Sequence, residues 1–280
     1  MNDFQFSVLI PVYIKENPQH LQLALQSVID QTLQPNEIII VEDGMLTNEL
    51  YAIIELFKNQ QPQLFSIVKL QQNSGMGVAM NEGLKVCKYN WVARMDSDDI
   101  CVNTRFEQQI NFLKQHKNID IVGGYIEEFQ HIVGDLKQVR HLPTAHNAIK
   151  HFAKYRNPLN HMTVMYSKHK AVEAGGYWHY RLLEDYHLWF MMLINDCQFA
   201  NLPQTLVNAR VGNNMLSRRK GLPYLKMEIF FFKKMLKQKF INYPQFLKAI
   251  FSRSLMKIIP IQILEKMYSL LLRNKQNSNA

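Results

Sequence analysis

Three aspartates are crowded into one short stretch of the chain. Ala93-Arg-Met-Asp-Ser-Asp-Asp99 closes a run of apolar residues with Asp96, Asp98 and Asp99. Carboxylates at the exit of a buried strand repel one another unless a cation relieves the repulsion. A hard divalent ion carrying a diphosphate is the simplest relief. The alternative is a solvated acidic turn that caps the helix starting near Asn103.

Two further segments carry residues suited to binding a nucleotide. In Val41-Glu-Asp-Gly44, Glu42 and Asp43 can accept hydrogen bonds from a base N–H or from ribose hydroxyls. In Asn73-Ser-Gly-Met-Gly-Val-Ala-Met-Asn81, two glycines allow the backbone to approach a ligand closely, and Asn81 projects from the first turns of a helix. Each segment alone is also consistent with an ordinary turn or helix start.

A fourth segment, Leu183-Glu-Asp-Tyr-His-Leu-Trp189, begins a helical pattern with an acidic pair. Asp185 can act there as a general base facing an acceptor, or only as a partner of the helix dipole. Four further residues are candidates for holding phosphates or acceptor hydroxyls: His161, Arg210, Arg218 and Arg219. The alternatives are a structural histidine and a solvated basic face.

The elements that must position these residues follow a βαβαβαβ order in the first half of the chain. Short apolar runs predict strands at Phe6–Tyr13, Glu37–Val41, Phe65–Leu70 and Trp91–Met95. Helical spacing predicts helices between them, at Pro18–Gln31, Thr47–Asn59 and Met76–Cys87. Ligands of such open sheets bind beyond the carboxyl ends of the strands, so the polar loops should converge on one site.

The second half is expected to be mixed. We predict a helix at Asn103–His116, a β-hairpin within Ile119–Gln138, a helix at Asp185–Asn195 and, from Pro223 onward, helices interrupted at Pro244 and Pro260. The expected division is a catalytic domain at 1–220, with a nucleotide-binding half at 1–100 and an acceptor half at 101–220. A helical, membrane-associating extension would occupy 221–280.

Composition sets the compartment and the possible partners. The chain has 280 residues, 47% of them hydrophobic, enough for a full core. Its three widely spaced cysteines indicate neither a disulfide framework nor a zinc site. No signal peptide or membrane-spanning stretch is evident, so a cytoplasmic location is expected. Residues 205–280 hold 15 Lys and Arg against two Glu, which suggests a polyanionic partner.

Taken in order, the VEDG, NSGMGVAMNEG, DSDD and EDYHLW segments resemble family 2 glycosyltransferases of the GT-A fold, over about residues 5–220. This resemblance implies that Asp43 binds uracil, that Asp96 and Asp98 bind the ribose and the metal-bridged diphosphate, and that Asp185 is the base. It further implies donor contacts by Pro11, Glu42, Asn81 and Ser97, metal binding by Asp98, and an acceptor contact by Glu184. The cofactor would be Mn²⁺ or Mg²⁺.

The segments Asn157–Tyr166 and Gly175–Tyr177 look like the subgroup that builds bacterial capsule and O-antigen repeat units. That likeness implies an inverting enzyme that moves a hexose, glucose or galactose, from a UDP-sugar to an undecaprenyl-diphosphate-linked sugar with a β bond. The enzyme would lie on the inner face of the plasma membrane. Two positions depart from the pattern: Met80 stands where many relatives have Arg, and Ile14 stands where Asn is frequent.

The basic C-terminal part mixes lysines with a strong apolar face at Ile229–Phe240 and Leu255–Leu272, as helices at a membrane interface do. Packing on the catalytic domain is the alternative. Two other function classes compete: a nucleotidyltransferase, although Pro11–Asn17 contains no glycine, and a nucleic-acid-binding protein, although no nucleic-acid motif is present. We therefore expect an anionic membrane surface, and no nucleic acid, as the partner of this part.

Overall fold

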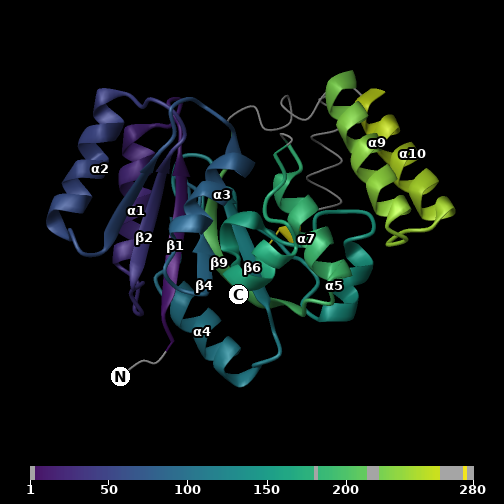
Figure 1. The fold of residues 1–280 in the computed structure, drawn as a ribbon, viewed down its shortest axis with the longest axis horizontal. Coiled ribbons are helices and arrows are strands. Elements are labelled where there is room, and N and C mark those ends of the chain that lie inside the picture. The colour runs from purple at the N-terminus through teal and green to yellow at the C-terminus, as the bar shows by residue number, and fades with distance from the viewer. Residues whose placement is uncertain (1–3, 180–181, 213–220, 259–273, 276–280) are drawn as a thin grey trace.

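The structure is a computed structural model that describes residues 4–179, 182–212, 221–258 and 274–275 (Figure 1). Its first part confirms the predicted alternation of strands and helices. The strands are β1 (Phe6–Val12), β2 (Glu37–Glu42), β3 (Phe65–Lys69) and β4 (Trp91–Arg94), and they pair in parallel in the order β4-β1-β2-β3. The helices between them are α1 (Pro18–Ile29), α2 (Asn48–Gln60) and α3 (Met76–Val86).

Local chemistry explains where the first two helices start. The Asn17 side chain accepts hydrogen bonds from the backbone N–H groups of Gln19 and His20, and Pro18 occupies the first helical position. Thr47 caps α2 in the same way through the backbone N–H of Leu50. Both caps satisfy N–H groups that lack a partner at the start of a helix.

The second part of the sheet is mainly antiparallel. Its strands are β5 (Ile100–Cys101), β6 (Ile121–Phe129), β7 (Gln138–Arg140), β8 (Met165–Ser167), β9 (Phe199–Arg210) and β10 (Asn274–Lys275). β8 joins the two parts by pairing antiparallel with both β4 and β6. The predicted hairpin is confirmed as β6 and β7, although β7 begins only at Gln138.

Helices cover both faces of the sheet. Around it lie α4 (Arg105–Gln115), α5 (His146–Phe152), the 3₁₀ helix η1 (His161–Thr163), α6 (Lys168–Glu173) and α7 (Glu184–Ile194). Alternate strand residues face opposite cores: Val8, Ile38 and Ile40 pack against α1, α2 and α4, whereas Leu9, Ile39 and Val41 pack on the side of α3 and α7. Burial on both faces explains the nearly continuous apolar runs of the parallel strands.

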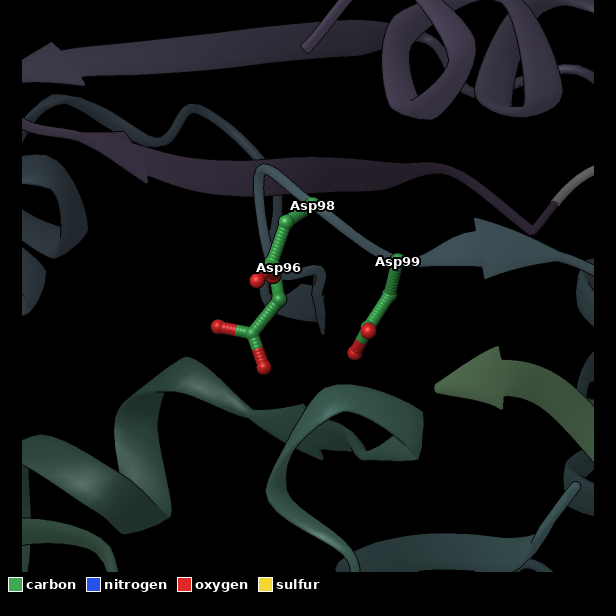
Figure 2. A group of neighbouring side chains, drawn as sticks. All are labelled: Asp96, Asp98 and Asp99. Atoms are coloured by element: carbon green, nitrogen blue, oxygen red, sulfur yellow. The ribbon is translucent and has the colours of Figure 1, made fainter. Parts of the chain in front are cut away.

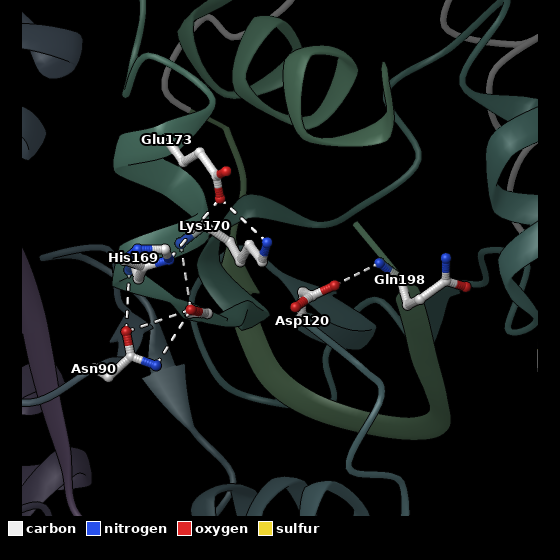
Figure 3. Close-up of polar contacts among 7 residues, drawn as sticks. Asn90, Asp120, His169, Lys170, Glu173 and Gln198 are labelled. Atoms are coloured by element: carbon white, nitrogen blue, oxygen red, sulfur yellow. Dashed lines mark hydrogen bonds and ion pairs between the residues drawn. The ribbon is translucent and has the colours of Figure 1, made fainter. Parts of the chain in front are cut away.

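A polar network joins the two parts at the strand ends opposite the loops of interest (Figure 3). Asn90, just before β4, exchanges hydrogen bonds with the Ser167 hydroxyl and accepts one from the His169 backbone N–H at 3.0 Å. Asp120, just before β6, accepts a hydrogen bond from the backbone N–H of Gln198 at 2.8 Å. These contacts fix the start of β4 against the end of β8, and the start of β6 against the start of β9.

Two C-terminal helices, α9 (Leu222–Lys237) and α10 (Tyr243–Ile258), lie side by side at the edge of the molecule next to α7 (Figure 1). Phe231, Phe232 and Met235 of α9 are buried in the same core as α7. Arg253 of α10 is paired with the buried Glu228 of α9 at 3.0 Å. The predicted start of the helical part near Pro223 and the predicted interruption near Pro244 are both found, whereas Pro260 and residues 259–273 lie outside the described part.

The described helices were also compared with the requirements of a membrane span. Within that part of the chain, no helix combines the length and the apolar character needed to cross a bilayer. Cys87, Cys101 and Cys197 are all free thiols, and all three are buried.

Candidate active site

The acidic loop follows directly after β4 and gathers three carboxylates. Oxygen atoms of Asp96, Asp98 and Asp99 lie within 4.8 Å of one another. Figure 2 shows Asp96 and Asp99 on neighbouring sides of this loop, with their carboxylates extending away from the β1 strand behind them. Asp99 is buried, and the other two are partly buried. The sequence therefore located this cluster correctly.

Electrostatics in the cluster favour a bound cation. Burial, followed by repulsion from Asp96 and Glu16, raises the pKa of Asp98 to about 7. Burial and the charges of Asp96 and Asp98 raise the pKa of Asp99 well above its ordinary value. In addition, Oδ2 of Asp99 is buried without a hydrogen-bond partner among the described residues. Carboxylate oxygens are the ligands that Mg²⁺ and Mn²⁺ prefer, so these residues fit a divalent ion.

Arg94, two residues before the cluster, forms its fixed counter-charge. The side chain is 1% exposed and pairs with the carboxylate of Asp96. Nη2 also lies 3.6 Å from the sulfur of Met76, while Nε and Nη1 are buried without an acceptor in the described structure. The sequence analysis did not assign a role to Arg94. A charged residue within an otherwise apolar buried strand is the signal that could have found it.

Two other residues hold the acidic loop in place. Ser97 is buried, and its hydroxyl donates to Oε2 of Glu16 at 2.7 Å. The backbone N–H of Arg210 donates to Oδ1 of Asp99 at 2.7 Å, and its Nε donates to the carbonyl oxygen of Asp98 at 3.1 Å. Arg210 therefore lies at the cluster, and its contact with phosphates or acceptor hydroxyls stays a prediction. Arg218 and Arg219 lie outside the described residues.

Asp43 lies at the end of β2 and organises the loop that leads into α3. Its carboxylate accepts hydrogen bonds from the backbone N–H groups of Ser74 at 2.7 Å and Gly75 at 3.0 Å, and from the side-chain amide of Asn73 at 3.1 Å. Gly75 has φ = 91°, a conformation that favours glycine. These bonds join the second and third polar segments of the sequence into one structural unit.

Pro11 and Glu42, two other residues predicted to contact the sugar donor, lie at the same edge of the sheet, but their side chains have different surroundings. Pro11 is buried in β1 and pairs in register with Val41 of β2. Glu42 is buried, its Oε2 lies 3.6 Å from the Nζ of Lys69, and burial raises its pKa despite that lysine. Glu42 also interacts electrostatically with Lys58 of α2, so its side chain is directed toward the α2 layer. Its assignment as a donor contact stays a prediction.

Asn81 of α3 binds the backbone of the acceptor half. Its Nδ2 donates to the carbonyl oxygen of Tyr177, and its Oδ1 accepts from the N–H of Tyr177, both at 2.8 Å. Met80, one of the departures from the family pattern, is fully buried in the apolar core. In this structure Asn81 thus positions the loop that carries Tyr177, and a donor contact by Asn81 stays a prediction.

His161 lies beside Tyr177, within electrostatic range of Arg94. Its Nε2 is 3.1 Å from the hydroxyl of Tyr177, which donates to the hydroxyl of Tyr166 at 3.2 Å. Burial and the nearby positive charge of Arg94 lower the pKa of His161 well below its ordinary value. His161 is therefore neutral near pH 7 and can accept or donate a hydrogen bond without carrying charge.

Asp185 occupies the first turn of α7, where the helix dipole favours a negative charge. Its Oδ2 accepts a hydrogen bond from the side-chain amide of Asn157 at 2.5 Å, and its Oδ1 accepts from the backbone N–H of Tyr186 at 2.7 Å. Burial raises the pKa of Tyr177, and both Asp185 and Asp96 add to this rise. Tyr177 thus lies within electrostatic range of the proposed base and of the acidic loop.

Glu184, the other member of the acidic pair, is partly buried against α3. A Cβ atom added to Gly77 would lie 3.1 Å from Cγ of Glu184 and 1.9 Å from the carbonyl oxygen of Trp178. The second glycine of the Asn73–Asn81 segment is therefore needed for the packing of α3 against Trp178 and Glu184. The sequence did not reveal this role, because the contact joins residues about a hundred positions apart.

Comparison with known proteins decides the family. The model of "Glycosyl transferase family 2" matches residues 7–181. The chain belongs to family 2 of the glycosyltransferases. This membership favours an enzyme that transfers sugars over the nucleotidyltransferase alternative.

Curated relatives of this family 2 glycosyltransferase cover it almost completely. An uncharacterized glycosyltransferase of Haemophilus influenzae is 43% identical and aligns over 96% of this chain and 99% of its own. The amylovoran biosynthesis glycosyltransferase AmsE of Erwinia amylovora is 36% identical, over 94% and 97%. The UDP-Gal:alpha-D-GlcNAc-diphosphoundecaprenol beta-1,3-galactosyltransferase of Escherichia coli is 34% identical, over 96% and 97%.

Solved structures confirm the fold. Residues 1–349 of TarS from S. aureus, in complex with UDP-GlcNAc, match with a TM-score of 0.65 at 17% identity, covering 95% of this chain and 73% of that one. The mannosyltransferase PcManGT of Pyrobaculum calidifontis, in complex with GDP-Man and Mn²⁺, matches with a TM-score of 0.59 at 14% identity, covering 96% and 81%. With the observed sheet order, these likenesses establish the GT-A fold of this family 2 glycosyltransferase.

Proposed function

We propose that this glycosyltransferase moves a hexose, galactose or glucose, from a UDP-sugar to a sugar carried on undecaprenyl diphosphate. The reaction inverts the anomeric carbon and forms a β bond during O-antigen or capsular polysaccharide synthesis, at the cytoplasmic face of a bacterial plasma membrane. The observation that carries the proposal is the cluster of Asp96, Asp98 and Asp99 after β4, together with Asp185 in the first turn of α7; Asp96 and Asp185 both act electrostatically on Tyr177. The 34%-identical galactosyltransferase of E. coli supports the donor and the acceptor class.

Donor binding is assigned to the strand ends of the first half. Asp43, with Pro11 and Glu42 beside it, is assigned to the uridine. Asp96 and Ser97 are assigned to the ribose and the diphosphate, and Asp98 with Asp99 would hold Mn²⁺ or Mg²⁺. When bound, that ion supplies positive charge against the negative charge that develops on the diphosphate. Arg210 at the same loop adds a fixed cation.

Asp185 is assigned the acid–base step. Its carboxylate takes the proton from an acceptor hydroxyl, the hydroxyl oxygen forms a bond to the anomeric carbon, and the bond from that carbon to the diphosphate breaks. UDP leaves with the bonding electrons, and attack from the face opposite to UDP turns an α-linked donor into a β-glycoside. The hydrogen bond from Asn157 fixes the orientation of the Asp185 carboxylate.

The experiment that tests this function is a panel assay with full-length protein. UDP-Gal, UDP-Glc, UDP-GlcNAc and GDP-Man are each offered with a GlcNAc-diphosphate-lipid, in Mn²⁺ or in EDTA, and the product is analysed by NMR. We expect acceptor-dependent release of UDP from UDP-Gal or UDP-Glc, loss of turnover in EDTA and in Asp98→Asn, and a β bond.

The matched control is Asp30→Asn, which removes an exposed carboxylate at the end of α1. It should keep wild-type turnover. Transfer from GDP-Man alone, or an α-linked product, would refute the proposed donor or the proposed stereochemistry.

A further inference from the structure

α10 exposes apolar side chains along one side. Tyr243, Leu247 and Phe251 are 62%, 50% and 73% exposed, and their spacing of four residues places them on one face of the helix. The opposite face packs inward through Phe246, Ala249 and Ile250. A stripe of three exposed large apolar residues in a row is unusual for a surface that meets only water.

α9 continues this pattern with positive charge. Leu222 and Phe230 are 71% and 50% exposed, and exposed lysines lie between and beyond them at helical spacing: Lys226, Lys233 and Lys237. Lys248 is exposed beside the α10 stripe. Within the described residues, none of these four lysines forms an ion pair.

No acidic group on these two helices opposes that charge. Glu228 is the sole acidic residue between 222 and 258, and it is 7% exposed and paired with Arg253. Apolar side chains interleaved with lysines that form no ion pair are complementary to a partner surface that is both apolar and negatively charged. An anionic lipid bilayer has that combination, because acyl chains lie just beneath its phosphate groups.

We propose that the exposed side chains of α9 and α10 form one surface that docks on an anionic bilayer, with Leu222, Lys226, Phe230, Lys233 and Lys237 from α9 and Tyr243, Leu247, Lys248 and Phe251 from α10. The proposal rests on the proposed function in that a lipid-linked acceptor lies in the same membrane. Phe230 connects this surface to the site: its ring stacks on Trp178 at 5.7 Å, and Trp178 stacks on His187 of α7 at 4.5 Å. Docking thus brings the helix that carries Asp185 next to the lipid surface.

Vesicle flotation of the full chain tests the proposal without any turnover. We compare vesicles of phosphatidylcholine alone with vesicles that also contain 30% phosphatidylglycerol. Two triple variants are used, Tyr243→Ser/Leu247→Ser/Phe251→Ser and Lys233→Gln/Lys237→Gln/Lys248→Gln. We expect wild type to float with the anionic vesicles and each triple variant to bind at least tenfold more weakly, with the lysine variant also losing the salt dependence of binding.

Matched controls change the same residue types elsewhere on the surface. Leu56→Ser/Ile132→Ser removes two other exposed apolar residues, and Lys58→Gln/Lys85→Gln removes two other exposed lysines. Both controls should float like wild type. Circular dichroism melts of every variant separate loss of binding from loss of the fold.

Several outcomes would overturn the proposal. Wild type that ignores anionic vesicles, or triple variants that float like wild type, would show that this surface does not dock on lipid. If the triple variants instead lost self-association in light scattering, the partner of this surface would be a second copy of the chain. If they lost DNA binding in a shift assay, the partner would be nucleic acid. Flotation with no sugar transfer would refute the proposed function and leave the docking intact, whereas transfer to a water-soluble short-chain acceptor should be unchanged in both triple variants.

Discussion

Arg94 shows how single residues set the charge of the candidate site. Its fully buried guanidinium faces three carboxylates but pairs directly with Asp96 alone. One arginine leaves the cluster of three carboxylates with an excess of negative charge, which a divalent ion can balance. Arg94 therefore fixes the Asp96 carboxylate and leaves the cluster with negative charge that can attract a cation.

The variant Arg94→Met tests this account of the charge. Removing one partner of a buried ion pair costs about 3 kcal/mol, at the low end of the usual range because Asp96 keeps some solvent contact. We expect a lower melting temperature in EDTA, and a larger upward shift on adding Mn²⁺ than in wild type, since the uncompensated cluster gains more from the ion. Differential scanning fluorimetry measures both. Equal Mn²⁺ shifts in the two proteins would contradict the role of Arg94 as counter-charge.

At this scale the sequence predicted which carboxylates gather, because residue type and loop position suffice for Asp96, Asp98 and Asp99. It could not predict that the side chains of Asp43 and Asn81 bind loop backbone, since those partners are set by tertiary packing. Nor did it single out Glu16, which holds Ser97 and faces Asp98.

Between elements, the contact of α3 with Trp178 and Glu184 is unusually close. Gly77→Ala would place a methyl group 1.9 Å from the carbonyl oxygen of Trp178, so one element must move. Alanine is favoured over glycine within a helix by about 1 kcal/mol, but overpacking of this kind costs about 1–3 kcal/mol. We expect a lower melting temperature together with reduced turnover, because Glu184 is one of the residues that must move.

Val86→Ala is the control for this substitution, because it changes an exposed position of the same helix. Its melting temperature and turnover should match those of wild type. If Gly77→Ala also behaved like wild type, the packing of α3 against Trp178 and Glu184 would not constrain the site.

The contact between α7 and α9 gives stability a pH dependence. Burial, followed by the positive charges of Lys234 and His179, lowers the pKa of His187 from 6.5 to about 3. The ring of His187 stacks on Trp178, which carries no titratable group. The unfolded chain takes up a proton near pH 6.5 and the folded chain does not, so stability is full above pH 6.5 and falls as the pH drops toward 3.

Urea unfolding at pH 7 and pH 5 measures this effect. Wild type should lose up to about 2 kcal/mol between these values through His187, at about 1.4 kcal/mol per pH unit below 6.5. His187→Gln should lose less, whereas the exposed His169→Gln should follow wild type. The same loss in His187→Gln as in wild type would show that other groups carry the pH dependence.

The parallel strands and their helices were predictable because a strand buried on both faces reads as a continuous apolar run. The second half was harder to predict. β9 (Phe199–Arg210) pairs with both β6 and β5, and its register with β6 shifts between Gly124 and Ile126, so local periodicity does not reveal its partners. The helix at α7 was found because its apolar face repeats at helical spacing.

For the molecule as a whole, two unlike halves meet over one site. The parallel half supplies Asp43 and the acidic loop, and the second half supplies Asn157, Tyr177 and Asp185. The order of motifs along the chain predicts a nucleotide-binding half and an acceptor half, and these two roles stay a prediction. The transferred sugar could not be predicted, since selectivity between hexoses depends on a few hydroxyl contacts made by side chains from both halves.

The central claim, that Asp185 is the base of a sugar transfer, is tested most directly by the isosteric variant Asp185→Asn. Asparagine keeps an oxygen able to accept the hydrogen bond from the Tyr186 backbone N–H, but it cannot take the acceptor proton. Its NH₂ group takes the place of Oδ2, so the Asn157 amide must turn its oxygen toward it to keep their hydrogen bond. The account predicts that kcat for transfer falls by about 10²- to 10⁴-fold, while the melting temperature and the Kd for UDP in Mn²⁺ stay at wild-type values. Wild-type kcat in Asp185→Asn would contradict it, and would reduce Asp185 to a partner of the α7 dipole.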